Sequence, residues 1–256
     1  DSASPVLPAR LDAFTMDRYE YSVGRYRSLL RRGFSPPDDG PVEAKEAISP
    51  DATRLAAMYC SWNQAPDGGA QFPAQEELPL NCVSWATARA ACQFDGGDLP
   101  TVAQHEFASA AAGKATKSTY PLGANAPDCG QAVYGRWSEA TRGNDECRAS
   151  GFGLQSIRSG ANLSDRTPTD VTALGGNVSE WTLDSHRRYD HSCWVGPYRL
   201  ACNEDEAPLR TVKGGSWRQA RSLTRTSTRL GAPPIAKDDA VGFRCVYPLS
   251  PPRGVR

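Results

Sequence analysis

The sequence predicts one α+β domain with little regular secondary structure, held together by disulfides. Three observations lead to this fold class. The 256 residues include 23 Gly and 20 Pro but few long periodic runs, which favours turns and loops over a helical bundle. Eight cysteines are dispersed along the chain with no CxxC spacing, which argues against zinc ribbons and thioredoxin motifs. A hydrophobic content of 39% is enough for one sizeable core, and no change in composition marks a linker between two domains.

The first part of the chain predicts a strand and three short helices. Alternating side chains over 14–21 indicate the strand. Before each expected helix stands a Ser or Thr whose side-chain oxygen accepts a hydrogen bond from a free backbone N–H, and after each stands a Gly that stops it. The expected caps and stops are Ser22 with Gly33, Ser84 with Gly96, and Thr101 with Gly113, where Gln104 adds a capping box.

Regular structure becomes sparse in the rest of the chain. Residues 35–80 are dominated by turn signals, and beyond Gly113 only short strand-like segments recur, at 210–213 and 242–247. We expect a single domain over residues 12–247, between an N-terminal linker at residues 1–11 and a C-terminal tail at residues 248–256.

The charge balance and hydropathy exclude two classes of partner. Lys plus Arg and Asp plus Glu both number 29, so no global field attracts nucleic acid or anionic lipid. The longest apolar stretches are far shorter than the roughly 18 residues that a membrane-spanning helix needs. We therefore expect no nucleic-acid partner and no transmembrane segment.

The cysteines predict a disulfide framework, which forms in an oxidising compartment. We therefore expect a secreted, periplasmic or cell-surface protein whose export signal is absent from this chain. Eight cysteines allow on the order of a hundred connectivities, so their number alone selects none. Short turn-rich loops suggest Cys60 with Cys82, Cys129 with Cys147, and Cys193 with Cys202, and Cys92 and Cys245 remain.

Six segments together resemble the formylglycine-generating-enzyme, or sulfatase-modifying-factor, family. They stand in the family's order: Leu-Asn-Cys-Val-Ser-Trp at 80–85, Gly-Asp-Leu-Pro-Thr at 97–101, Tyr-Pro-Leu-Gly at 120–123, Gly-Gly-Asn-Val-Ser-Glu-Trp-Thr at 175–182, Lys-Gly-Gly-Ser-Trp at 213–217 and Gly-Phe-Arg-Cys at 242–245. The strand and helix over 14–30, with Glu20 between them, are similar to the family's opening. The resemblance implies a C-type-lectin-like fold and a disulfide between Cys92 and Cys245.

The resemblance also implies a calcium site, formed by the backbone carbonyls of Gly176 and Val178 and the carboxylate of Glu180. Calcium takes roughly six to eight oxygen ligands. The position three before Gly176 is usually Asn or Asp in the family, but here it is Ala173, so water or Asp170 would have to replace one ligand. The alternative is that Glu180 accepts backbone hydrogen bonds in a tight turn. Both interpretations stay open at this point.

The family's oxidase reaction depends on two cysteines that follow Gly-Gly-Ser-aromatic and bind Cu(I), which selects soft thiolates. In this chain the two positions carry Gln219 and Thr224, and no cysteine lies between Cys202 and Cys245. An amide and a hydroxyl do not replace thiolates. The resemblance therefore implies a member without copper and without formylglycine-generating activity.

A binding or scaffold module is the function that these observations favour. Loops on a rigid frame often carry recognition, and aromatic residues and Arg dominate binding energy. The expected surface lies between Asp184 and Thr228, and its ligand is an unknown protein, peptide or glycan. The candidate contact residues are Tyr189, Trp194, Tyr198, Trp217, Arg218, Gln219, Arg221 and Thr224, with core packing as the other interpretation of Trp217.

The alternative function is a metal- or cofactor-dependent oxidoreductase or maturation enzyme that acts on a peptide or siderophore precursor. Imidazole and carboxylate together form common open metal sites. His186 and His191, with Asp184 or Asp190, are the candidate ligands, and solvent-exposed loop histidines are the other interpretation.

Overall fold

Two small sheets and four short α-helices organise the part of this protein that the structure describes. The computed structural model describes residues 10–44, 59–137, 146–194 and 201–249. The helices are α1 (Val23–Arg31), α2 (Trp85–Phe94), α3 (Val102–Glu106) and α4 (Gly160–Ser164). The strands are β1 (Phe14–Met16), β2 (Ser179–Ser185), β3 (Arg210–Lys213), β4 (Arg229–Ala232), β5 (Val241–Gly242) and β6 (Val246–Pro248). The fold is therefore the expected α+β class.

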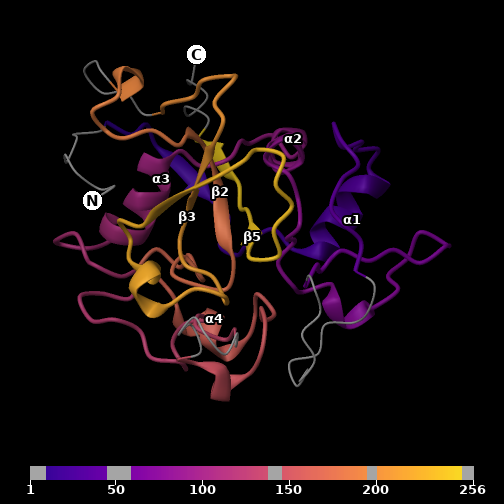
Figure 1. The fold of residues 1–256 in the computed structure, drawn as a ribbon, viewed down its shortest axis with the longest axis horizontal. Helices are drawn as coiled ribbons and strands as arrows, with labels where there is room; N and C mark the ends of the chain where they lie inside the picture. Colours follow the sequence, from indigo (N-terminus) through magenta and orange to yellow (C-terminus); the bar gives the residue numbers. More distant parts are fainter. Residues whose placement is uncertain (1–9, 45–58, 138–145, 195–200, 250–256) are drawn as a thin grey trace, which may run out of the picture.

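The larger sheet has the strand order β4-β3-β2-β5. Neighbouring strands in it run antiparallel except β2 and β5, which run parallel. In Figure 1, α1 and α2 lie on one side of these strands and α3 lies on the other. The smaller sheet pairs β1 with β6, and Pro248, the first residue of the expected tail, lies opposite Phe14. This pairing joins the two ends of the described chain.

The three expected helix caps are confirmed. The side chain of Ser22 accepts a hydrogen bond from the N–H of Arg25, and that of Ser84 accepts one from the N–H of Thr87. The side chain of Thr101 accepts one from the N–H of Gln104, and the reciprocal bond of the capping box is also present. The third helix continues beyond α3 as a π-helical turn over Phe107–Ala111. Gly33, Gly96 and Gly113 have φ of +90°, +85° and +68°, the left-handed conformation that ends a helix at low cost for glycine.

The strands follow the expectations less closely. The expected strand over 14–21 forms β-structure only at Phe14–Met16, and the segment over 242–247 divides between β5 and β6. The expected strand over 210–213 is β3. No strand was expected where β2 lies, and a tight turn at Glu180 was one of the two open interpretations. The seven residues of β2 are buried almost throughout, so they lack the alternation that reveals a half-buried strand.

The core lies between the larger sheet and helices α1 and α2. Trp181 from β2 is fully buried and its indole N–H donates to the carbonyl of Val83, 3.0 Å away, just before α2. Tyr21 and Phe243 stack with ring centroids 4.6 Å apart. None of the helices within the described residues has the length and apolar character that crossing a membrane requires.

All eight cysteines are paired. The disulfides are Cys60–Cys82, Cys92–Cys245, Cys129–Cys147 and Cys193–Cys202, so the three pairs suggested by short loops and the pair implied by the resemblance are confirmed. Cys92–Cys245 closes the longest loop, with a sequence separation of 153, and ties α2 to the segment that enters β6.

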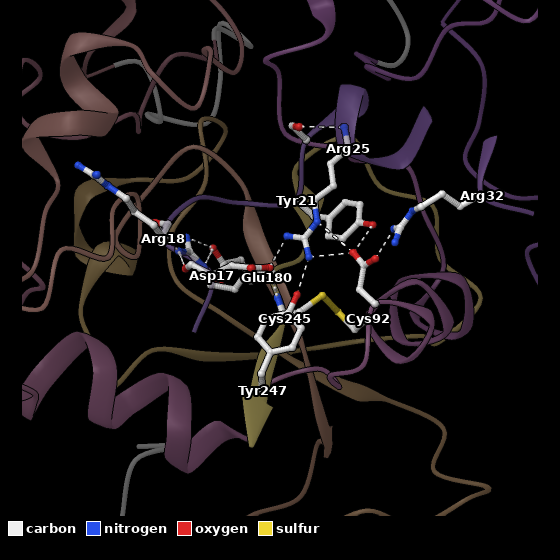
Figure 2. A network of polar contacts seen from close by, with 12 residues as sticks. Asp17, Arg18, Tyr21, Arg25, Arg32, Cys92, Glu180, Cys245 and Tyr247 are labelled. Atoms are coloured by element: carbon white, nitrogen blue, oxygen red, sulfur yellow. Dashed lines mark hydrogen bonds and ion pairs between the residues drawn. A yellow bond between two sulfur atoms is a disulfide. The ribbon is translucent and has the colours of Figure 1, made fainter. Parts of the chain in front are cut away.

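A polar network surrounds the Cys92–Cys245 disulfide (Figure 2). Arg25 forms ion pairs with Asp17 at 2.6 Å and with Asp95 at 2.9 Å, and also donates to the hydroxyl of Tyr247. Tyr21 donates its hydroxyl proton to Asp95, 3.0 Å away. The network therefore connects α1, the end of α2 and the β1–β6 sheet around one covalent link.

Candidate functional site

The Gly-Gly-Ser-Trp segment follows β3 and packs directly against residues 174 and 175. Gly214 has φ of +75°, and a Cβ there would lie 3.0 Å from the carbonyl oxygen of Leu174. A Cβ on Gly215 would lie 2.6 Å from the carbonyl oxygen of Gly175, closer than atoms tolerate. Both glycines are therefore required by close backbone approach, which sets the position of the residues that follow.

Backbone hydrogen bonds hold residues 217–219 from two sides. The N–H of Trp217 donates to the carbonyl of Asn177 at 2.9 Å. On the other side, Gly135 donates to the carbonyl of Gln219 and Arg136 to the carbonyl of Trp217, each at 2.8 Å. The segment is thus built into the frame rather than carried on a free loop.

The two positions where the resemblance places thiols carry polar side chains with local partners. The side-chain oxygen of Gln219 lies 3.4 Å from the hydroxyl of Ser179. Thr224 is fully buried and donates its hydroxyl to the carbonyl of Arg221 at 2.8 Å, closing a short 3₁₀ turn. Neither side chain supplies a soft donor, so these residues do not fit Cu(I).

An aromatic cluster packs around Trp217 of the 217–219 segment. Trp217 is fully buried, and its ring centroid lies 5.4 Å from that of Tyr59 and 5.6 Å from those of Trp137 and Phe152. Its indole N–H donates to the carbonyl of Asp239 at 3.1 Å. Neither Trp217 nor Thr224 reaches the surface in this structure, which favours the core-packing interpretation of Trp217. Contact of these two residues with a ligand stays a prediction.

Arg218 covers the same cluster. Its guanidinium lies 4.0 Å from the ring centroid of Trp137 and 4.7 Å from that of Trp217, and it pairs with Asp239 at 2.6 Å. Burial raises the pKa of Asp239, and Arg218 opposes that rise. Arg221 is half-exposed and lies 3.6 Å from Glu146. Of the expected contact residues in this part of the molecule, three are at least partly exposed: Arg218, Gln219 and Arg221.

Tyr189 and Trp194 belong to a different cluster. They pack on the Cys193–Cys202 disulfide with ring centroids 5.3 Å apart. The guanidinium of Arg229 lies 4.1 Å from the ring centroid of Tyr189. In Figure 1 the turn at residues 192–194 and the turn at residues 221–224 lie toward opposite ends of the central strands.

The single surface expected between Asp184 and Thr228 is therefore two separate regions. Tyr198, the remaining expected contact residue, lies outside the described residues.

The carboxylate expected to bind calcium is engaged by two side chains. Nε of Arg244 lies 2.9 Å from Oε1 and 2.8 Å from Oε2 of Glu180, and Nη2 of Arg244 lies 2.6 Å from Oε1. Nε2 of His105 lies 3.2 Å from Oε2 of Glu180. Burial, the largest single effect, raises the pKa of Glu180, but Arg244 and His105 together lower it overall.

Glu180 therefore lies in β2 with side-chain partners, not in a tight turn with backbone partners. A calcium ion that used Glu180 with the carbonyls of Gly176 and Val178 would have to replace a buried guanidinium, and this site stays a prediction.

The histidines expected to hold a metal are not assembled with the expected carboxylates. Asp184 is fully buried and accepts hydrogen bonds from the N–H groups of Val102 and Cys202, both at 2.6 Å. Asp190 is exposed and pairs with Arg188. His186 is partly buried, with Nδ1 3.5 Å from the hydroxyl of Thr211.

One group within the described residues has metal-ligand spacing: His191, Cys193, Cys202 and Glu204, with ligand atoms within 4.8 Å of one another. Its two sulfurs are joined in a disulfide, which leaves two donors, from His191 and Glu204.

Several residues around the site were missed. Arg136, Trp137 and Phe152 border the 217–219 segment, and Asp239 anchors both Trp217 and Arg218. The one signal available was local: Gly135-Arg-Trp places a cation and an aromatic side by side in a turn-rich region. Sequence spacing did not connect Arg136 and Trp137 to residues 217–219, about 80 positions later, since backbone pairing between distant segments produces no periodic pattern in the sequence.

Comparison with known proteins agrees with this architecture. The family model of the sulfatase-modifying factor enzyme 1-like domain matches residues 1–249. The "Inactive C-alpha-formylglycine-generating enzyme 2" of Bos taurus is 28% identical over 200 residues, which are 75% of this chain and 58% of that protein, so the chain spans little more than half of that relative. A formylglycine-generating enzyme of Thermomonospora curvata is 25% identical over 264 residues, 96% of this chain and 85% of that protein.

Two solved structures share the fold. PvdO from Pseudomonas aeruginosa superposes with a TM-score of 0.60 at 19% identity, covering 92% of this chain and 80% of that one. CarF superposes with a TM-score of 0.59 at 17% identity, covering 95% and 89%. With the family model matching nearly the whole chain, the protein belongs to the sulfatase-modifying factor enzyme 1-like domain family.

Proposed function

We propose that this protein is a non-catalytic member of the formylglycine-generating-enzyme family that acts outside the cytoplasm as a binding or scaffold module. The observation that carries the proposal is the pair Gln219 and Thr224 at the positions of the thiols. Both have hydrogen-bond partners or contacts of their own, and no cysteine is free to take over the role.

The architecture of the site supports binding. Residues 217–219 are hydrogen-bonded from two sides, so Arg218 and Gln219 are held in place before a ligand arrives. Preorganised side chains lose less entropy on binding, and Arg lying on aromatic rings is a frequent contributor to binding energy. The similarity to proteins described as inactive formylglycine-generating enzymes points in the same direction.

The disulfides support a place outside the cytoplasm. Four disulfides with no free cysteine are typical of proteins that fold in oxidising compartments, since reducing systems in the cytosol keep thiols reduced. The ligand is a peptide, a glycan or a neighbouring protein that meets the surface of Arg218, Gln219 and Arg221.

The direct test is aldehyde formation on a cysteine-bearing sulfatase peptide, followed by mass spectrometry in the presence of Cu(I) and oxygen. We expect none from the wild-type protein. The matched variant is Gln219→Cys with Thr224→Cys, which restores two thiols on the same backbone, and an active formylglycine-generating enzyme shows that the assay works. Aldehyde formed by the wild-type chain would contradict the proposal.

Metal analysis tests the alternative of an oxidoreductase or maturation enzyme. We expect neither copper nor iron in stoichiometric amount in purified protein before treatment with a chelator. The one described group with metal-ligand spacing keeps only two donors, His191 and Glu204, once its cysteines are joined in a disulfide. Either metal at one equivalent per chain, lost together with an activity on chelation, would replace the binding proposal by the enzyme.

A further inference from the structure

Arg136 is an exception among the buried arginines of the described residues. It is 3% exposed, yet its Nε and Nη1 have no hydrogen-bond partner. The other buried arginines all have partners for their guanidinium groups: Arg27 with Glu76 and two carbonyls, Arg210 with Asn203 and two carbonyls, Arg229 with the carbonyl of Arg187, and Arg244 with Glu180 and three carbonyls.

An unpaired buried guanidinium is costly. Arginine keeps its proton in proteins, so it cannot escape the cost by neutralisation. Buried charges are normally paired, and a buried donor without an acceptor loses its hydration without compensation. The position of Arg136 therefore calls for an acceptor that the described residues do not supply.

Two carboxylates of the surrounding segments already have partners. Asp239 accepts hydrogen bonds from Arg218 and from the N–H of Tyr59, and Glu146 pairs with Arg221. Arg148 adds a further guanidinium 4.6 Å from the ring centroid of Phe152. Within the described residues, Arg136 is thus left without a carboxylate partner.

Arg136 is also fixed next to the candidate binding segment. Its N–H donates to the carbonyl of Trp217 at 2.8 Å, one residue before Arg218. On its other side the backbone of Gly151 approaches so closely that a Cβ there would lie 3.2 Å from Nη1. The backbone therefore keeps this guanidinium between the 217–219 segment and the turn at Gly151.

We propose that Arg136 is the anchor for a carboxylate group of the ligand. This inference rests on the proposed binding function and specifies the chemistry of the ligand. One guanidinium matches one negative charge, so a carboxylate balances it, whereas a phosphate dianion would leave a charge unpaired in the same apolar surroundings of Trp137 and Trp217. The carboxylate belongs either to a small organic acid or to an acidic peptide side chain.

The test measures thermal unfolding and calorimetric binding of the full chain at low ionic strength. The small probe is sodium acetate, compared with sodium chloride at equal ionic strength. The peptide probe is Gly-Glu-Gly, acetylated and amidated so that it carries one carboxylate, with Gly-Gln-Gly as its neutral match. We expect a carboxylate to raise the melting temperature of the wild-type protein by about 5 °C near saturation, because a ligand that binds only the folded state stabilises it.

Two variants make the result specific. Arg136→Met removes the charge and keeps the volume, so without ligand it should melt at or above the wild-type temperature and should lose the response to carboxylate. Arg148→Met, on the same aromatic cluster, should keep the response. Arg136→Gln repeats the test with a shorter polar side chain.

Each outcome decides the matter. A response to acetate and no stronger response to the peptide supports a small organic acid, and at least tenfold tighter binding of Gly-Glu-Gly than of acetate supports an acidic peptide. No response of the wild-type protein to either, a response that survives in Arg136→Met, or a large loss of stability in both Arg136 variants without ligand would overturn the proposal. The aldehyde assay is independent of these results, so failure here leaves the non-catalytic assignment standing.

Discussion

Arg244 holds both carboxylate oxygens of Glu180 inside the core, with N–O distances of 2.6 to 2.9 Å. The same guanidinium donates to the carbonyls of Asp17, Arg18 and Thr172. One side chain therefore connects β2, the segment between β5 and β6, and the chain after β1. Both side chains are almost completely buried, so each depends on the other for compensation of its lost hydration.

Arg244→Met should destabilise the protein by about 3–5 kcal/mol, because it leaves the Glu180 carboxylate buried without its cation. Urea unfolding measures the change. The double variant Arg244→Met with Glu180→Gln should recover part of the loss, since it also removes the isolated charge. A loss below about 1 kcal/mol in the single variant would show that Glu180 finds another partner or becomes protonated at little cost.

Calcium should have little effect on stability. Arg244 already supplies the positive charge at Glu180, and Ala173 supplies no side-chain oxygen where the family usually has one. We expect the melting temperatures in millimolar calcium and in excess chelator to agree within about 1 °C, since a bound ion would shift them by mass action. A calcium-dependent rise of several degrees that disappears in Glu180→Gln would instead establish the site with Gly176 and Val178.

Stability should decline as the pH rises from about 6.5 to 8. Burial, reinforced by Glu180, raises the pKa of Glu20 from 4.5 to about 8, and burial raises the pKa of Asp165 from 3.8 to about 7. Because these folded-state values exceed the unfolded ones, the folded state binds more protons. The contribution is present below the unfolded pKa and is lost as the pH rises through the folded pKa.

Other buried groups act in different windows. Burial lowers the pKa of His105, so this group makes stability rise with pH only below about 6.5. Burial also lowers the pKa of Lys213 to about 8, so this group makes stability rise with pH only above about 8. Urea unfolding between pH 6.5 and 8 should therefore show a decline on the order of 1 kcal/mol, and Glu20→Gln should reduce its slope. A free energy of unfolding that is constant or rises across this interval would contradict the assignment.

The four disulfides should differ in their contributions. In the loop-entropy model, Cys92–Cys245 with a separation of 153 restricts the unfolded chain by about 5 kcal/mol, and Cys193–Cys202 with a separation of 9 by about 2.5 kcal/mol. Paired Cys→Ala variants, compared by urea unfolding, test the order. Equal losses would mean that the long link contributes mainly through native contacts rather than through the unfolded chain.

The sequence was most informative where structure depends on neighbours in the chain. Ser22, Ser84 and Thr101 cap helices because their oxygens reach backbone N–H groups three residues later, a relation visible in any local window. It was least informative for β2, whose residues are buried on both faces, and for the contact surface. Tyr189 and Trp194 belong to a different cluster from the rings that Arg218 covers.

Residue types at characteristic spacings, together with the family resemblance, thus predicted the α+β family fold, the disulfide framework and the absence of the thiol pair, because covalent and soft-metal chemistry admits few substitutes. Only the tertiary structure decided that Glu180 faces Arg244, 64 positions away, that Trp217 is buried, and that Arg136 is left without an acceptor. Such pairings depend on which distant segments the fold brings into contact and on how far it excludes water from them, and neither quantity is written in local sequence.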